Sequence, residues 1–308
     1  MRYHCAAAPS RRHDLAAPFQ QVPDAGPFRI ASVLCVMEWA AYFGVFVSLT
    51  LYLTRVAGFT DVEAGWVAGV FGLLACVLPV AAGTWVDRVG YRRALIVAYV
   101  LLATGYGALA AVPGRASTLA ALALVVAGGS VTRTAIMATA ATTSDSAGRA
   151  RAYSILMQMI NVGCFIGKAV ARPIRVGLGV EYSGAWAAAA TLLALGTVVL
   201  FYRDAAPARA LASGGLSVAW KGLGRVMRNR RFLGAIMVAG VFWAVQVQLY
   251  AVMPKYLTRL VGETASPEWY ANVNPLVVIL LIVPVTRATR GMSPRASMAI
   301  ALALVALS

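Results

Sequence analysis

Two charged side chains of opposite sign lie inside apolar stretches of this sequence, where a charge needs either a partner or a role. Glu38 lies near the middle of one long apolar segment, and Arg133 lies deep within another. A lone charge at mid-membrane costs about 2.5–3.5 kcal/mol on insertion scales. A Glu38–Arg133 pair would neutralise both groups, and protonation of the carboxylate would release the arginine. The pair is therefore either a static contact or a proton-operated switch.

A third charge inside an apolar segment, Lys168, follows Asn161 and Phe165 at helical spacing on a stripe that continues to Arg172. Its long side chain either faces a cavity or extends to the outer water interface, and its position favours extension. Other polar or aromatic residues within apolar segments are candidates to bind a solute, although each also suits packing. These candidates are Tyr42, Gln158, Asn161, Trp243, Gln246 and Asn274.

The elements that position these residues must be membrane helices. Hydrophobic residues make up 60% of the 308 positions and charged residues only 12%, against about 25% charged in soluble domains. This composition excludes a soluble enzyme and a disordered chain. Since about 20 apolar residues cross a bilayer as a helix, we expect an all-α polytopic membrane protein. The expected spans are 28–53, 64–86, 94–112, 117–141, 152–174, 184–202, 232–257 and 271–288, with a partial ninth from residue 296.

Polar stretches divide the chain into four parts. Residues 1–27 predict a cytoplasmic tail, residues 28–202 a six-span bundle, residues 203–231 a basic cytoplasmic linker, and residues 232–308 an incomplete second bundle. Within the first bundle two GxxxG pairs predict close helix–helix approach. These pairs are Gly65 with Gly69 and Gly163 with Gly167.

Basic charge is sorted by side of the membrane. The net charge is +16, and most of the 27 Lys and Arg residues fall in the tail and in alternate loops on the same side. This positive-inside pattern predicts a cytoplasmic N-terminus. We expect the chain to lie in the plasma (inner) membrane. Because the charge is spread through short loops, it does not form the single basic face of a nucleic-acid-binding protein. The few basic residues on the opposite side are Arg55, Arg115, Arg172, Arg175, Lys255 and Arg259.

The sequence offers no catalytic or metal-binding constellation. No two of the four cysteines form a CxxC pair, and three lie within apolar spans, where a free Cys behaves as a small hydrophobe. His4 and His13 lie with Cys5 in the polar tail, where we expect a solvated segment rather than a metal site. An HExxH motif and a nucleophile–His set are both missing. We therefore expect neither an enzyme nor a cofactor.

The loop between the second and third expected spans carries the most specific motif. Its residues, GTWVDRVGYRR from Gly83 to Arg93, resemble the signature G-x-x-x-D-R-x-G-x-R-R of the major facilitator superfamily at every defining position. Asp87 ends a helix where its carboxylate can meet a neighbouring helix N-terminus, and Gly90 permits a tight turn. The resemblance implies a latch between the two halves of an outward-facing transporter. Its residues would be Gly83, Asp87, Arg88, Gly90, Arg92 and Arg93.

Shorter runs resemble the proton-dependent oligopeptide transporter family. The run from Glu38 to Gly44, EWAAYFG, is similar to the end of that family's ExxER-x-x-[YF]-[YF]-G motif. Cys35 and Trp39 stand at the other two charged positions of the motif, so only Glu38 remains. Further similar runs are Gly128-Gly129 before Arg133, residues 153–163, Trp243 with Gln246, and Asn274-Pro275 with Pro284.

Together the resemblances imply a secondary active transporter of a small solute, working by alternating access about a midplane site. Glu38 and Arg133 would couple transport to protons, so the expected partners are a small-molecule substrate, H⁺ and the lipid bilayer. Two alternatives remain open. One is a non-transporting membrane module or truncated transporter fragment, and the other is an efflux-type exporter of the same superfamily.

Overall fold

The structure, a computed structural model, describes residues 25–144 and 149–203 without interruption. It also describes residues 228–307 except for 231–232, 235, 238–239, 242–243, 245–249, 251, 263–264 and 290–291. The described part is helical, without a strand, so the predicted all-α class is confirmed. The tail residues His4 and Cys5, most of the expected linker, and the candidates Trp243 and Gln246 lie outside the described residues.

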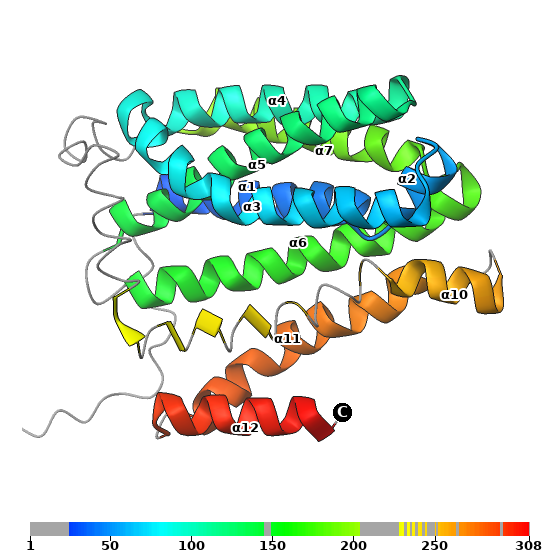
Figure 1. Cartoon of the computed structure of the whole chain (residues 1–308). Coiled ribbons are helices and arrows are strands. Elements are labelled where there is room, and N and C mark those ends of the chain that lie inside the picture. The colour runs from blue at the N-terminus through cyan, green and yellow to red at the C-terminus, as the bar shows by residue number, and fades with distance from the viewer. Residues whose placement is uncertain are drawn as a thin grey trace, which may run out of the picture.

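Most helices follow the expected spans (Figure 1). The expected seventh span, 232–257, is described only in part, and α10 begins near its end. Six helices, α1 and α3 to α7, are long and apolar enough to cross a membrane, and α11 and α12 match the expected eighth span and partial ninth. The helices are α1 (Ala25–Phe46), α2 (Leu49–Arg55), α3 (Asp61–Val89), α4 (Tyr91–Ala111), α5 (Arg115–Thr142), α6 (Arg149–Gly177), α7 (Tyr182–Phe201), α10 (Met253–Val261), α11 (Pro267–Thr289) and α12 (Pro294–Leu307).

The first expected span, 28–53, is wrong in its last part. α1 ends at Phe46 and α2 begins at Leu49, with a turn at Val47 and Ser48 between them. There the Ser48 amide donates to the Val45 carbonyl at 3.1 Å, which is an i→i−3 bond rather than the i→i−4 bond of an α-helix. Both sides of the turn are apolar, so hydropathy alone does not reveal the break.

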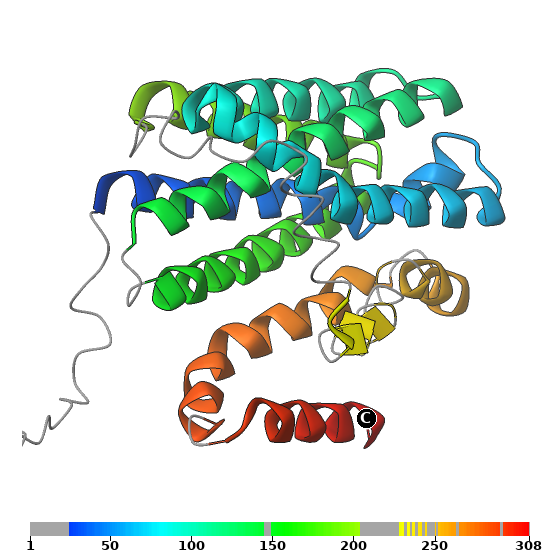
Figure 2. The same ribbon diagram turned by 60° about the vertical axis from the view of Figure 1, so that its left-hand side comes forward.

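The helices from α1 to α7 form one bundle, which we call the N-terminal bundle. α1 packs between α6 and α7, and α4 packs between α5 and α7 (Figures 1 and 2). A Cβ placed on Gly163 of α6 would lie 2.6 Å from the Val36 carbonyl of α1, so this GxxxG pair brings two backbones together as predicted. Gly65 and Gly69 of α3 have open space around them. The prediction of close helix packing at this pair is therefore wrong for the described part of the chain.

Apolar side chains cover the outside of the bundle. Trp66 of α3 is 73% exposed and Leu200 of α7 is 74% exposed. Such surfaces are costly in water and favourable in lipid. The exposed apolar faces therefore agree with the membrane location that the composition predicts.

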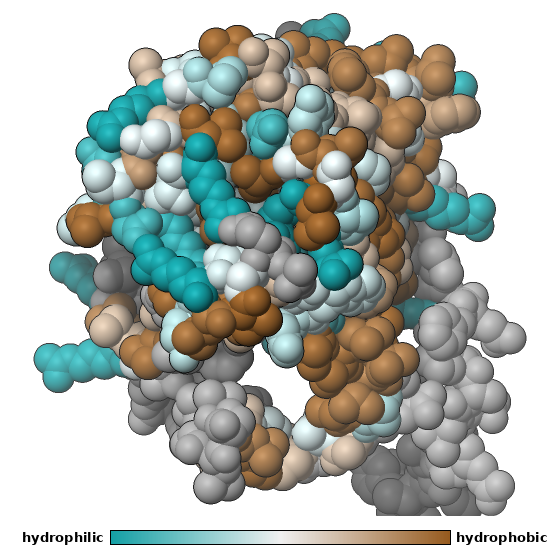
Figure 3. All heavy atoms as spheres, turned by 90° about the vertical axis from the view of Figure 1, so that its right-hand side faces the viewer, coloured by the Kyte–Doolittle hydropathy of each residue, from teal (hydrophilic) through white to brown (hydrophobic). Residues whose placement is uncertain are grey.

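The two ends of the bundle are named by the predicted orientation in the membrane. The outer end carries Arg55, Asp61, Arg115 and Glu181, and the inner end carries the turn at Gly90. Viewed onto the outer end, Figure 3 shows hydrophilic side chains gathered on this face, with hydrophobic ones around it. We call residues 228–307 the C-terminal part, and its boundary with the N-terminal bundle the seam.

Candidate functional site

The structure brings Glu38 of α1 and Arg133 of α5 together in the middle of the bundle. Arg133 Nε donates to Glu38 Oε1 at 3.1 Å, and the side chains are 19% and 3% exposed. The pairing expected from the two charges is therefore present. The second carboxylate oxygen, Glu38 Oε2, is buried without a hydrogen-bond partner within the described ranges. A bare buried carboxylate oxygen is unfavourable, and a proton at this atom would remove its charge.

Aromatic rings hold the guanidinium of Arg133. Its Cζ lies 4.6 Å from the ring centroid of Trp39 and 4.6 Å from that of Tyr42. Both residues are on α1 beside Glu38, so one helix supplies the counter-charge and the two cation–π contacts. Tyr42, a predicted cavity residue, thus belongs to this site.

Lys168 departs from the expectation that its side chain extends to the outer interface. It is 1% exposed, and its Nζ donates to the Tyr250 hydroxyl at 3.0 Å and to the Ala271 carbonyl at 3.1 Å. The ammonium also lies 4.6 Å from the Phe43 ring centroid and 4.7 Å from that of Tyr250. Both acceptors lie across the seam, so the side chain is held inside the protein instead of extending to the interface.

An aromatic stripe on α1 connects the two cations. Trp39, Tyr42, Phe43 and Phe46 share one face by their i, i+3, i+4, i+7 spacing, with Arg133 over its first two rings and Lys168 over its third. The Tyr42 and Phe43 centroids are 5.2 Å apart. The spacing can be read in the sequence, but neither the stripe nor its association with Lys168 was predicted.

The other predicted cavity residues do not converge on the Glu38–Arg133 pair. Gln158 of α6 is half-buried, and Asn161 donates to the Met157 carbonyl of its own helix at 2.8 Å. Asn274 is exposed on α11. Its neighbour Asn272, which sequence reasoning missed, is buried and donates to the Phe165 carbonyl of α6 at 3.1 Å. Trp243 and Gln246 have no described position.

Near the outer end, α6 and α11 are joined by a buried ion pair. Arg175 Nε donates to Glu268 Oε1 at 2.5 Å, with side chains 3% and 1% exposed. Arg175 also donates to the Ala265 carbonyl at 2.7 Å. One turn earlier, Arg172 donates to Ser266 Oγ at 2.6 Å. The basic stripe of α6 is therefore used to hold α11, not to face lipid headgroups.

A second, more exposed ion-pair cluster joins α3 to α10. Asp61 pairs with Lys255 at 2.5 Å and with Arg259. Beside it lies a pocket of about 450 Å³, whose lining includes Thr50, Gly65, Gly69 and Tyr250. The Thr50 hydroxyl is buried and lacks a partner in the described part of the chain. The outer side of the seam is thus closed by contacts at two levels.

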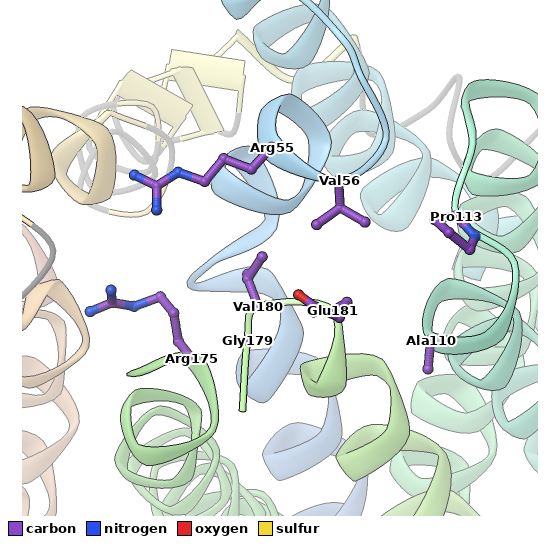
Figure 4. A pocket seen from close by; sticks show the side chains of 8 residues that line it. All are labelled: Arg55, Val56, Ala110, Pro113, Arg175, Gly179, Val180 and Glu181. Carbon is purple, nitrogen blue, oxygen red and sulfur yellow. The ribbon is translucent and has the colours of Figure 1, made fainter. Parts of the chain in front are cut away.

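Another pocket, of about 550 Å³, lies at the outer end (Figure 4). In Figure 4 the side chains of Arg55 and Arg175 extend away from the others, and Val56 and Glu181 lie between them and Pro113. Its lining combines two arginines, Arg55 and Arg175, with the single carboxylate of Glu181 and small apolar residues, and this mixture does not define a site for a particular ligand. We assign no function to this pocket.

The predicted latch motif lies at the inner end. Gly90 ends α3 with φ 93°, a conformation that favours glycine, so the predicted tight turn is confirmed. Gly83 faces α5, where a Cβ would meet Thr134 Cγ2 at 3.6 Å. Arg92 donates to the Val199 carbonyl near the end of α7 at 2.8 Å. Arg88 and Arg93 are exposed, and Asp87 is half-buried without an ion pair to any described residue.

The arrangement of the seam differs between the two ends. At the outer end, α11 contacts α6 through the ion pair and hydrogen bonds above. Toward the inner end α11 diverges from α6, and α12 lies apart from the N-terminal bundle (Figures 1 and 2). The described helices on the two sides of the seam are therefore in contact at the outer end and further apart toward the inner end.

These features define an all-α polytopic membrane protein, with a buried ion pair within one bundle and a second helical part joined across a seam. A family model described as Major Facilitator Superfamily matches residues 31–308. The chain belongs to the Major Facilitator Superfamily, as the loop motif indicated.

Curated relatives include proteins named Multidrug resistance protein MdtH. The protein of Edwardsiella ictaluri (strain 93-146) is 24% identical over 256 residues, which cover 80% of this chain and 60% of the relative. That of Photorhabdus laumondii subsp. laumondii is 21% identical over 251 residues, which cover 80% and 60% respectively. The chain thus spans about three fifths of the length of these relatives.

Solved structures with the same fold include POT family transporters. A crystal structure of the peptide transporter POT in complex with sulfate aligns with TM-score 0.70 and 19% identity, covering 89% of this chain and 71% of that one. A POT family transporter in complex with 5-aminolevulinic acid aligns with TM-score 0.71 and 15% identity, covering 87% and 71%. At these identities the likeness establishes the fold alone.

Proposed function

We propose that this protein is a secondary active transporter of a small solute, driven by protons and operating by alternating access. The observation that carries the proposal is the buried Glu38–Arg133 pair, in which one carboxylate oxygen has no hydrogen-bond partner among the described residues. Charged residues inside membrane helices are typical of ion and proton pathways. The proposed orientation places the N-terminus in the cytoplasm and the chain in the inner membrane, with residues 203–231 as the cytoplasmic linker.

The proposed coupling step is a proton transfer to Glu38 Oε2. The carboxylate becomes a neutral carboxylic acid, while Arg133 keeps its proton because guanidinium does not titrate in proteins. The ion pair is then replaced by a weaker contact, and Arg133, held by Trp39 and Tyr42, becomes available to a solute. A ligand shifts a conformational equilibrium only by its differential affinity for the two states, and proton binding would supply this difference.

Substitution of Glu38 by glutamine tests the coupling role. In proteoliposomes, Glu38→Gln should abolish uptake driven by a proton gradient, because no proton can bind or leave, and should leave counterflow exchange of the solute intact. Glu63→Gln is the matched control, since Glu63 is an exposed partner of Arg115 at the outer end. If gradient-driven uptake survives in Glu38→Gln, Glu38 is not the coupling residue.

A proton-driven exporter is the second candidate, favoured by similarity to the MdtH proteins. Both candidates use the same pair, and they differ in the direction of solute movement relative to the proton. Transport measured in right-side-out and inverted vesicles with an imposed pH gradient separates them, because a symporter moves solute with the protons and an exporter against them. Absence of movement in both vesicle types would favour a non-transporting membrane module.

A further inference from the structure

Lys168 is a buried cation whose described contacts are all with neutral groups. Its ammonium is bound by the Tyr250 hydroxyl and the Ala271 carbonyl and lies over two aromatic rings. An ion pair to this ammonium is missing from the described part of the structure. Burial of a charge without a counter-charge is unfavourable even when it is hydrogen-bonded. Packing alone therefore does not explain why a lysine occupies this position.

The acidic residues that the structure describes leave Lys168 without a counter-charge. Of the 11 Asp and Glu residues, only Glu38 lies in the middle of an apolar segment, and it is paired with Arg133. Glu268 is paired with Arg175, and residues 205–262, which lead to and include Tyr250, contain no acid. The aromatic stripe of α1 thus carries two cations and one carboxylate, a net positive charge.

The two acceptors of Lys168 belong to the other side of the seam. Lys168 is on α6 of the N-terminal bundle, whereas Tyr250 and Ala271 belong to the C-terminal part. When the outer side opens, the C-terminal part takes both acceptors away, and Phe43 of α1 stays beside the ammonium. The open state therefore presents a cation next to an aromatic surface, with unused hydrogen-bond donors.

From this geometry we infer that Lys168 is a recognition residue for an amphiphilic organic anion, one that carries a carboxylate or sulfonate on an aromatic or aliphatic body. The anionic group binds the ammonium, and the body lies on the Phe43 and Tyr42 rings. Tyr250 and Ala271 compete for the same ammonium and replace the anion when the outer side closes without ligand. The inference rests on the proposed function for the opening of the seam, whereas binding itself requires no transport.

Binding of three probes of one shape tests the inference. Calorimetry on the full chain in lipid nanodiscs compares 1-naphthoate, 1-naphthalenemethanol and 1-naphthylmethylammonium. The wild-type chain should bind naphthoate most tightly. Lys168→Gln should weaken naphthoate binding by at least about tenfold, because a hydrogen bond to a charged group is lost, and should leave the alcohol within about twofold. Lys168→Arg keeps the charge and should retain the preference for the anion.

Two further variants separate recognition from a structural role. Arg115→Gln removes a cation from the outer surface, away from the seam, and should not change the order of the probes. Tyr250→Phe removes one competing acceptor and should tighten naphthoate binding. If Lys168 only supported packing, Tyr250→Phe would weaken binding in the same way as Lys168→Gln. Each variant is first matched to the wild type in helical content and size-exclusion profile.

The inference is overturned if Lys168→Gln binds naphthoate as the wild type does, if the wild type prefers the ammonium probe, or if Tyr250→Phe weakens naphthoate binding. The outcomes that contradict the proposed transport function differ from those that contradict the inference. Lys168-dependent binding without solute movement in vesicles contradicts transport and supports the inference. Proton-driven uptake that Lys168→Gln leaves unchanged supports transport and contradicts the inference.

Discussion

Removing one member of the Glu38–Arg133 pair leaves a buried charge, whereas removing both leaves a neutral site. Breaking a buried pair by deleting one partner costs about 3–5 kcal/mol, while replacing both by apolar groups is often neutral. We expect Arg133→Met to lower the free energy of unfolding by about 3–5 kcal/mol and Glu38→Met with Arg133→Met to restore most of it. Denaturant unfolding in detergent measures both. Simple addition of the two single effects would contradict an energetic coupling between these residues.

Individual residues also show which contacts can be predicted from a sequence. The Glu38–Arg133 pair was predictable because few charges lie in apolar segments, and opposite charges there must meet. The contacts of Lys168 were not predictable, because the acceptors are a hydroxyl and a backbone carbonyl, groups that occur throughout the chain. Likewise, Asn272 and Asn274 are equivalent in type, and only the rotation of α11 decides that Asn272 faces α6.

At the scale of helices, the two GxxxG pairs give a matched comparison. An added methyl at Gly163 would meet the α1 backbone, whereas one at Gly65 meets open space. Overpacking a well-packed contact costs about 1–3 kcal/mol. We therefore expect Gly163→Ala to lower the free energy of unfolding by this amount and Gly65→Ala to change it little. Thermal unfolding in detergent compares the two, and equal effects would contradict the packing of α1 on α6.

Helix positions were predictable to a few residues because bilayer thickness fixes the length of the apolar segments. The expected span 94–112 and the observed α4 (Tyr91–Ala111) illustrate the agreement. The break between α1 and α2 was not predictable, since Val45, Val47 and Leu49 are apolar on either side of the turn. At the break, Val47 packs in a core cluster with Tyr250 of the C-terminal part. Such a tertiary contact cannot be predicted from the hydropathy of one segment.

At the scale of the whole molecule, basic residues have two distinct uses. Those on the predicted cytoplasmic side are expected to set the orientation, whereas basic residues on the outer side make ion pairs or hydrogen bonds in the structure, among them Arg115, Arg172, Arg175, Lys255 and Arg259. All but Arg115 act across the seam. Because these contacts are made in the closed arrangement and are lost when the seam opens, any net energy that they contribute biases the molecule toward outer closure.

The closing contacts should differ in strength according to burial. The Arg175–Glu268 pair is 3% and 1% exposed, whereas Asp61 is 51% exposed. Removal of one partner of an exposed pair changes an equilibrium by up to about fivefold, whereas removal of one partner of a buried pair leaves an uncompensated buried charge and costs more. We expect Glu268→Gln to favour the outer-open state by at least about tenfold and Asp61→Asn by about two- to fivefold.

Cysteine accessibility measures this equilibrium directly. Thr50 is 4% exposed and lines the pocket beneath the Asp61 cluster, so a Thr50→Cys thiol should react with a membrane-impermeant maleimide only when the outer side opens. In a chain whose native cysteines are replaced by alanine, labelling should accelerate most in Glu268→Gln and less in Asp61→Asn. Glu63→Gln should not accelerate it, because Glu63 and Arg115 lie in the same bundle and their pair is not broken by opening. Equal labelling rates in all three variants would mean that seam contacts do not control outer access.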